Sequence, residues 1–69
     1  MKNKLKPHRL LAELTQEELA NKVQVSRQTI HAIEKGKYNP SVQLALKLSS
    51  ILDKDLKELF ELEEDDWKE

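Results

Sequence analysis

Two capping boxes constrain the fold of this chain more than any other feature of its sequence. Thr15 and Glu18 have the required spacing, because the hydroxyl can accept the Glu18 N–H while the Glu18 carboxylate accepts the Thr15 N–H. Asp55 and Glu58 repeat the arrangement near the end of the chain. Helices are therefore expected to begin at residues 16 and 56.

Single capping residues indicate where the other helices begin and end. Ser26 and Ser41 are N-cap candidates, and Gly36 can end a helix in the left-handed conformation. Pro7 suits the first turn of a helix, where its missing N–H is not needed. The sequence therefore predicts five helices, over about residues 6–13, 16–23, 27–35, 42–52 and 56–60.

Composition supports an all-α fold and excludes several kinds of site. The chain has 69 residues, enough for one small domain, and these include 12 Leu but a single Gly. One glycine cannot build a phosphate-binding loop or a dinucleotide fingerprint. The absence of Cys excludes disulfides and thiolate metal sites and fits a reducing cytoplasm. No apolar run approaches the roughly 20 residues of a membrane span.

The net charge of −1 conceals an uneven distribution. Residues 1–60 carry 11 basic and 7 acidic side chains, a net charge of +4. Residues 61–69 carry six acidic side chains and Lys68, a net charge of −5. Such asymmetry is typical of chains that bind nucleic acid or another charged partner, although the body is less basic than most DNA-binding domains.

Residues 16–35 have the pattern of a helix-turn-helix, in which two helices meet across a three- or four-residue turn. Ala20 is small where the helices approach, and Ile30 and Ile33 form the buried stripe of the second one. At about 100° per residue, the opposite side of that helix carries side chains suited to base edges in the major groove. These candidate base contacts are Arg27, Gln28, His31 and Ala32.

Several segments carry a resemblance to a known family. Leu-Thr-Gln-Glu-Glu-Leu-Ala (14–20), Val-Ser-Arg-Gln-Thr-Ile (25–30) and Ala-Ile-Glu-Lys-Gly-Lys-Tyr-Asn-Pro-Ser (32–41) resemble the phage repressor/Cro-type helix-turn-helix domains, or xenobiotic-response-element family. Residues 44–48 and 56–60 match as well. The resemblance, closest to the short stand-alone repressors, implies five helices and a homodimeric regulator that binds double-stranded DNA.

The resemblance also implies roles for individual residues. Phosphate contacts are expected from the first residue of the second helix, the start of the third helix and the loop that follows it, namely Gln16, Ser26, Thr29, Lys35, Lys37 and Asn39. Arg9 and Glu34 match a pair that joins the first and third helices in the family. Positions 13, 24 and 53, where the family favours Gly, are Glu13, Gln24 and Asp53 here.

The acidic tail, residues 61–69, leaves two interpretations open. Residues 1–5 and 60–64 alternate apolar with charged side chains, which predicts a small terminal β-pair with Lys2 and Lys4 facing Glu61 and Glu63, and Leu62 turned inward. In that case Phe60, Leu62 and Trp67 would form the dimer interface. The alternative is a frayed acidic tail.

Two functional classes fit the sequence. The first is a cytoplasmic transcriptional regulator, in particular a homodimeric repressor that reads a pseudo-palindromic operator through the major groove. The second is an antitoxin-like protein-interaction module with secondary DNA binding. An enzyme is not expected, because His8 and His31 lie on different helices with no suitably spaced nucleophile. No metal, cofactor or small-molecule ligand is expected.

Overall fold

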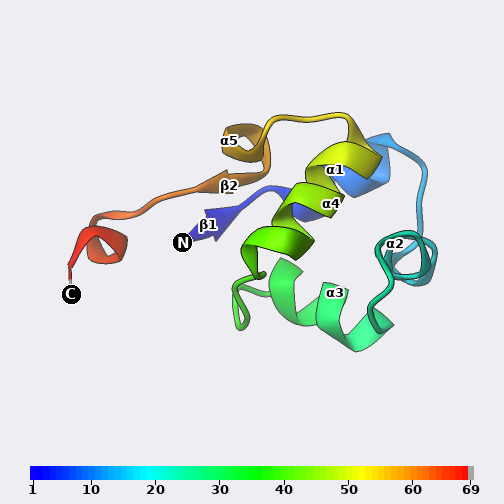
Figure 1. Cartoon of the computed structure of the whole chain (residues 1–69), viewed down its shortest axis with the longest axis horizontal. Coiled ribbons are helices and arrows are strands. Elements are labelled where there is room, and N and C mark those ends of the chain that lie inside the picture. The colour runs from blue at the N-terminus through cyan, green and yellow to red at the C-terminus, as the bar shows by residue number, and fades with distance from the viewer. Residues whose placement is uncertain (69) are drawn as a thin grey trace.

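Helices separated by short turns pack together, and a short strand near each end of the chain contributes to a small sheet (Figure 1). The structure is a computed structural model that describes residues 1–68. Its elements in chain order are β1 (Lys2–Asn3), α1 (Leu5–Leu11), α2 (Gln16–Val23), α3 (Arg27–Glu34), α4 (Val42–Leu52), α5 (Leu56–Leu59), β2 (Phe60–Glu61) and the 3-10 helix η1 (Glu64–Trp67). The predicted five helices with a terminal β-pair are confirmed.

The capping residues act as their spacing predicts. The Glu18 N–H donates to the Thr15 hydroxyl at 3.0 Å, and Glu18 Oε1 accepts the Thr15 N–H at 2.9 Å. These contacts with Thr15 hold the pKa of the Glu18 carboxyl below its usual value. Ser26 and Ser41 accept the N–H groups of Thr29 and Leu44 in the same way. Helix starts are thus determined by contacts within one turn.

Four helix boundaries differ from the prediction. The helix expected over 6–13 is α1, which begins at Leu5 and ends at Leu11. It ends early because Glu13 lies in the left-handed region at φ 59°. The helix expected over 27–35 ends at Glu34 and is followed by a turn at Gly36 (φ 74°). The helix expected over 56–60 ends at Leu59, because the extended backbone of Phe60 pairs with Asn3.

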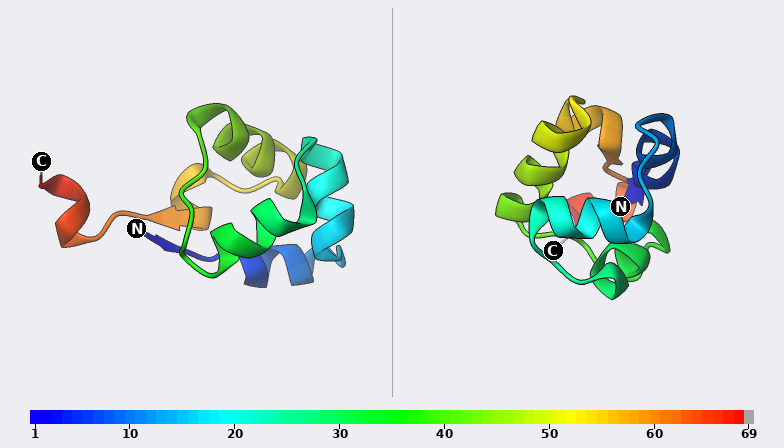
Figure 2. Two further views of the ribbon diagram at one scale, coloured as in Figure 1. Left: turned by 90° about the horizontal axis from the view of Figure 1, so that it is seen from below. Right: turned by 90° about the vertical axis from the view of Figure 1, so that its right-hand side faces the viewer.

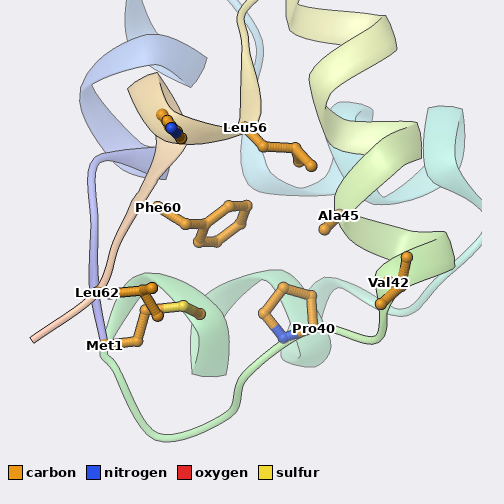
Figure 3. Close-up of a pocket in the computed structure, with 8 residues that line it drawn as sticks. Met1, Pro40, Val42, Ala45, Leu56, Phe60 and Leu62 are labelled. Atoms are coloured by element: carbon orange, nitrogen blue, oxygen red, sulfur yellow. The ribbon is translucent and has the colours of Figure 1, made fainter. Parts of the chain in front are cut away.

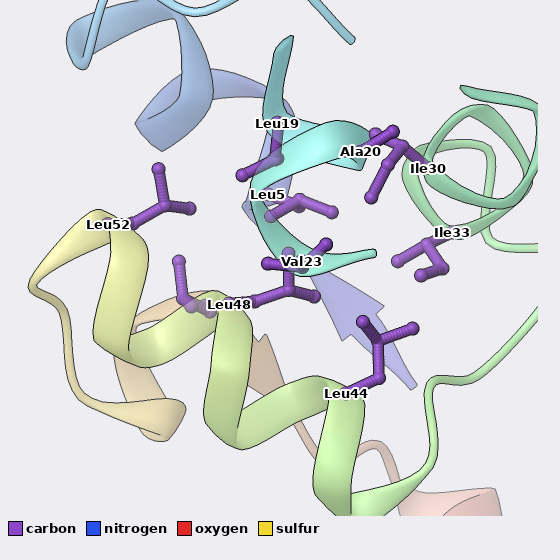
Figure 4. Packing of buried hydrophobic residues seen from close by; sticks show 10 residues of the cluster. Leu5, Leu19, Ala20, Val23, Ile30, Ile33, Leu44, Leu48 and Leu52 are labelled. Carbon is purple, nitrogen blue, oxygen red and sulfur yellow. The ribbon is translucent and has the colours of Figure 1, made fainter. Parts of the chain in front are cut away.

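The core lies where α1, α2, α3, α4 and α5 converge, and leucine dominates it (Figure 4). Its buried members are Leu5, Leu19, Ala20, Val23, Ile30, Ile33, Leu44, Leu48, Leu52 and Leu59. The partly buried side chains of Leu14, Val25 and Phe60 pack against this cluster. The inward positions expected for the helix-turn-helix are all among these residues.

The terminal sheet confirms one expected pairing and corrects another. Lys2 lies opposite Glu61, so it faces a glutamate of the tail as predicted, and Asn3 lies opposite Phe60. In this antiparallel register Lys4 lies beside Leu59, whose carbonyl accepts the Lys4 N–H at 2.7 Å, so the prediction that Lys4 faces a glutamate of the tail is wrong. Leu62 was also expected to turn inward, but its side chain is 55% exposed.

The amino-terminal group of Met1 contacts the acidic tail. Its nitrogen lies 3.0 Å from Glu63 Oε1 and 3.1 Å from Asp66 Oδ2. The hydrogen bonds that this amino group donates to Glu63 and Asp66 raise its pKa, while the Glu63 N–H and the amino terminus lower the pKa of Asp66. The tail extends away from the helices beyond β2 (Figures 1 and 2). Through Lys68, no helix is both long enough and apolar enough to cross a bilayer.

Candidate DNA-binding site

Helices α2 and α3 form a helix-turn-helix around the turn at residues 24–26. Gln24 adopts a left-handed conformation (φ 63°), and the Val25 N–H donates to the Ala20 carbonyl at 3.0 Å, so the chain reverses directly after α2. Ala20 is 1% exposed where the two helices pack. Since Gln24 is not glycine, this turn carries backbone strain of roughly 1–2 kcal/mol.

The two sides of α3 differ sharply in exposure. Ile30 and Ile33 are buried in the core, whereas Arg27, Gln28 and His31 are exposed. Ala32, the fourth candidate base contact, is half-buried. Ser26 caps the first turn of α3, which is open to solvent. The helix therefore packs on the core through its apolar face and presents its polar face outward.

The six candidate phosphate contacts occupy three separate places. Gln16 begins α2, Ser26 and Thr29 flank the start of α3, and the remaining three are exposed in the loop after α3, namely Lys35, Lys37 and Asn39. The Ser26 and Thr29 hydroxyls lie 3.0 Å apart, and Ser26 Oγ also accepts the Thr29 N–H at 3.2 Å. These two hydroxyls therefore already serve the helix start, whereas the loop side chains are solvated.

Arg9 and Glu34 form an ion pair between α1 and the end of α3. Arg9 Nε donates to Glu34 Oε2 at 2.7 Å and Arg9 Nη2 to Glu34 Oε1 at 3.3 Å. The side chains are only 8% and 4% exposed. Arg9 Nη1 also donates to the Leu14 carbonyl at 2.8 Å, so one guanidinium joins α1, the segment before α2 and α3.

Gln16 connects this buried pair to the outer face of α3. Its Nε2 donates to Glu34 Oε1 at 3.0 Å and lies 3.3 Å from His31 Nδ1. Its Oε1 accepts from Arg27 Nη1 at 3.3 Å. The resemblance implied a phosphate contact for Gln16, and its bonds to His31 and Glu34 gave no signal in the sequence, because they join residues 15 and 18 positions apart.

Asn3 joins the terminal sheet to α3, although the sequence did not single it out. Its Nδ2 donates to the Ile33 carbonyl at 2.8 Å, and its Oδ1 accepts the Leu5 N–H at 3.3 Å. The terminal sheet is thereby tied to the last turn of α3. The partners lie 30 residues apart, so no local pattern could have predicted the contact.

An apolar groove of about 260 Å³ lies between the start of α4, α5 and β2 (Figure 3). Its lining includes two of the three candidate dimer residues, Phe60 and Leu62, together with Val42, which is 77% exposed. Trp67, the third candidate, is 77% exposed in η1 and does not line the groove. The structure therefore brings Phe60 and Leu62 together and leaves Trp67 apart.

The fold and the exposed face of α3 define a class of protein that the comparisons identify. The helix-turn-helix family matches residues 5–59, so this chain belongs to that family, in its phage repressor and xenobiotic-response-element branch. It is accordingly a DNA-binding transcriptional regulator of the helix-turn-helix type.

Relatives of similar length support the assignment. The chain is 54% identical over 66 residues to an uncharacterized HTH-type transcriptional regulator of Methanocaldococcus jannaschii, covering 96% of this chain and 100% of that protein. It is 46% identical over 65 residues to the HTH-type regulator YgzD of Bacillus subtilis, covering 94% and 98%. The restriction-modification controller protein C.AhdI of Aeromonas hydrophila superposes with a TM-score of 0.74 at 36% identity, covering 81% of each chain.

Proposed function

We propose that this protein is a homodimeric repressor that inserts α3 into the major groove of a pseudo-palindromic operator. The observation that carries the proposal is the division of α3 into a buried apolar face and an exposed face with Arg27, Gln28 and His31. Arg can hydrogen-bond guanine O6 and N7 in bidentate fashion, and Gln can do the same with adenine N6 and N7. Ala32, half-buried beside them, would meet the methyl group of a thymine.

Contacts to the DNA backbone would set the register of α3 in the groove. Lys35, Lys37 and Asn39 are exposed in the loop after α3, and Gln16 lies at the start of α2 beside Arg27. Ser26 and Thr29 lie at the end of α3 that would approach the groove, where their hydroxyls could also meet a phosphate. Because the Lys side chains would neutralise phosphates, affinity should fall steeply with salt.

Dimerisation would supply the second half-site. The groove beside Phe60 and Leu62 is apolar and open, and it uses α4, α5 and β2 rather than the outer face of α3. A second copy seated there would leave both α3 helices available for half-sites about one helical turn apart. Trp67 would take part through the tail that extends beyond β2. Deletion of residues 61–69 tests this: light scattering should show a shift from dimer to monomer, and an unchanged dimer would exclude the tail from the interface.

Repression would follow from occupancy of the operator by this protein. The described residues form a helix-turn-helix domain with a short tail, and a protein that covers an operator blocks other proteins there without a further active surface. Because its target would be chromosomal DNA, the proposed site of action is the cytoplasm.

Selection of duplexes from a random pool tests the proposed function. The purified protein should enrich a pseudo-palindrome, and Gln28→Ala should abolish the preference at one position of each half-site while leaving the fold intact. Gln43→Ala, an exposed glutamine of α4, is the matched control and should leave the enriched sequence unchanged. Failure of the wild-type protein to enrich any duplex at low salt would refute the proposal.

A further inference from the structure

We propose that buried Glu34, acting through the Gln16 amide, determines the hydrogen-bonding character of the outer face of α3. In this arrangement His31 is held with its proton on Nε2 and offers that N–H to an acceptor on DNA. Glu34 is thereby a positioning residue for recognition as well as the partner of Arg9. The DNA half of this inference rests on the proposed function, whereas the proton position on His31 does not.

The Glu34 carboxylate determines which end of the Gln16 amide faces it. Two Arg9 nitrogens, at 2.7 and 3.3 Å, hold this carboxylate in place, and its side chain is 4% exposed. An ionised carboxylate can only accept hydrogen bonds. The Gln16 group 3.0 Å from Glu34 Oε1 must therefore be the amide NH₂.

Arg27 requires the same orientation of the amide. A guanidinium has donors and no acceptor, so the Gln16 atom 3.3 Å from Arg27 Nη1 must be the carbonyl oxygen. The opposite orientation would set two acceptors against each other at Glu34 and two donors against each other at Arg27. The side-chain amide of Gln16 thus has one favourable orientation, required independently by its neighbours on both sides.

The proton on His31 follows from that orientation. The same Gln16 Nε2 has a second hydrogen and lies 3.3 Å from His31 Nδ1. Because an amide NH₂ donates, Nδ1 must accept, and a neutral imidazole that accepts at Nδ1 carries its proton at Nε2. A chain of hydrogen bonds therefore runs from Arg9 in the interior to His31 on the surface.

The exposed Nε2–H selects among DNA groups. It complements hydrogen-bond acceptors such as purine N7, guanine O6, thymine O4 or a phosphate oxygen. It does not complement the N4 amino group of cytosine, which is a donor. His31 is exposed on the same helix as Arg27 and Gln28, so the acceptor would be adjacent to the groups that those side chains contact.

Nitrogen-15 NMR of the imidazole rings tests the proton position without DNA. At alkaline pH the wild-type protein should show His31 Nδ1 as an unprotonated, pyridine-like nitrogen and Nε2 as a protonated, pyrrole-like one, with assignment from His31→Ala. Gln16→Met removes the amide but keeps the ion pair, so its His31 nitrogens should move toward the averaged shifts of a solvated imidazole. Gln43→Met is the matched control and should leave the His31 shifts unchanged.

Glu34→Gln tests the origin of the polarity. Its amide can either donate to or accept from Gln16, so in Glu34→Gln combined with Arg27→Met, which removes the second group that orients the Gln16 amide, the His31 shifts should average too, provided that the backbone spectrum remains folded. Gln16→Met keeps the test decisive if Glu34→Gln does not fold. Averaged shifts in the wild-type protein, or identical His31 shifts in wild type and Gln16→Met, would overturn the proposal.

Modified duplexes test the DNA half and distinguish a base from a phosphate acceptor. In the enriched duplex, 7-deazapurine at one position or methylphosphonate at one linkage should weaken wild-type binding about 3- to 10-fold. The same change should have no effect on His31→Ala. A 7-deazapurine effect identifies a base-edge acceptor, and a methylphosphonate effect identifies a phosphate. If neither effect depends on His31, the DNA half of the proposal is wrong. If no duplex is enriched, the proposed function fails, and the NMR result still decides whether the proton of His31 lies on Nε2.

Discussion

Removal of the Arg9 guanidinium should destabilise the domain severely, because it leaves a buried carboxylate without its cation. In Arg9→Met, the Glu34 carboxylate, whose side chain is 4% exposed in the wild-type protein, would retain only the amide of Gln16 as a donor. Breaking a buried ion pair by removing one partner typically costs about 3–5 kcal/mol. The Leu14 carbonyl also loses the donor that lies 2.8 Å away. Since small domains unfold with roughly 5–15 kcal/mol in total, the loss would be a large fraction of the stability.

Urea unfolding followed by circular dichroism measures this loss. The expected result is a large decrease in the urea midpoint with an unchanged slope, which reports a change in stability rather than in the surface exposed on unfolding. The double variant Arg9→Met/Glu34→Met removes both charges and should recover much of the loss, because apolar replacements of a buried pair are often neutral. Arg27→Met, which truncates an exposed arginine, should change stability by about 0.5 kcal/mol or less.

Two results would refute this reasoning. If Arg9→Met unfolds at the wild-type midpoint, the ion pair does not stabilise the domain. If the double variant is as unstable as the single one, the cost comes from lost packing or from the Leu14 carbonyl rather than from the unpaired Glu34 carboxylate.

Three further predictions concern the turn, the tail and the loop after α3. Gln24→Gly should raise the free energy of unfolding by about 1 kcal/mol, because glycine adopts φ 63° without strain; Gln24→Ala, which keeps the Cβ, should not, and urea unfolding compares them. The contact between the Met1 amino group and Asp66 should persist at neutral pH. The pKa of the amino group is raised above 8.0, so the contact is lost as pH rises through that raised value. The pKa of Asp66 is lowered below 3.8, so the contact is also lost as pH falls through that lowered value. Amide NMR shifts of Asp66 should therefore change at both extremes, and shifts that follow only the acidic titration would contradict a role for the amino group. Lys37→Ala should weaken binding to all duplexes alike and reduce the slope of log affinity against log salt by about 1, whereas an altered sequence preference would assign Lys37 to base contact instead.

Local chemistry explains what the sequence predicted well. The starts of α2, α3 and α4 depend on a side chain and an N–H group three residues later, and the start of α5 on the Asp55 N–H and the Glu58 carboxylate, so these signals lie within one turn. The buried face of α3 follows from the spacing of Ile30 and Ile33. The left-handed turn at Gln24 could be expected because the family favours glycine there, and its φ of 63° agrees.

Contacts between distant segments explain what the sequence did not predict. The closure of the turn after α1 depends on such contacts: the Leu14 N–H donates to the Arg9 carbonyl, and the guanidinium of Arg9 donates to the Leu14 carbonyl while it is held by Glu34, 25 residues away. The register of the terminal sheet likewise depends on where α5 ends, so alternation alone paired Lys4 with the wrong residue.

The sequence by itself determined the helices, their inward faces and the residues presented by α3, because each depends on spacing within a few residues. Only the tertiary structure decided which way those residues can hydrogen-bond. Arg9, Gln16, His31 and Glu34 come from three helices, and the direction of each bond between them is defined only when the helices pack. The physical reason is that donors and acceptors are short-ranged and directional, so their pairing exists only in the folded chain.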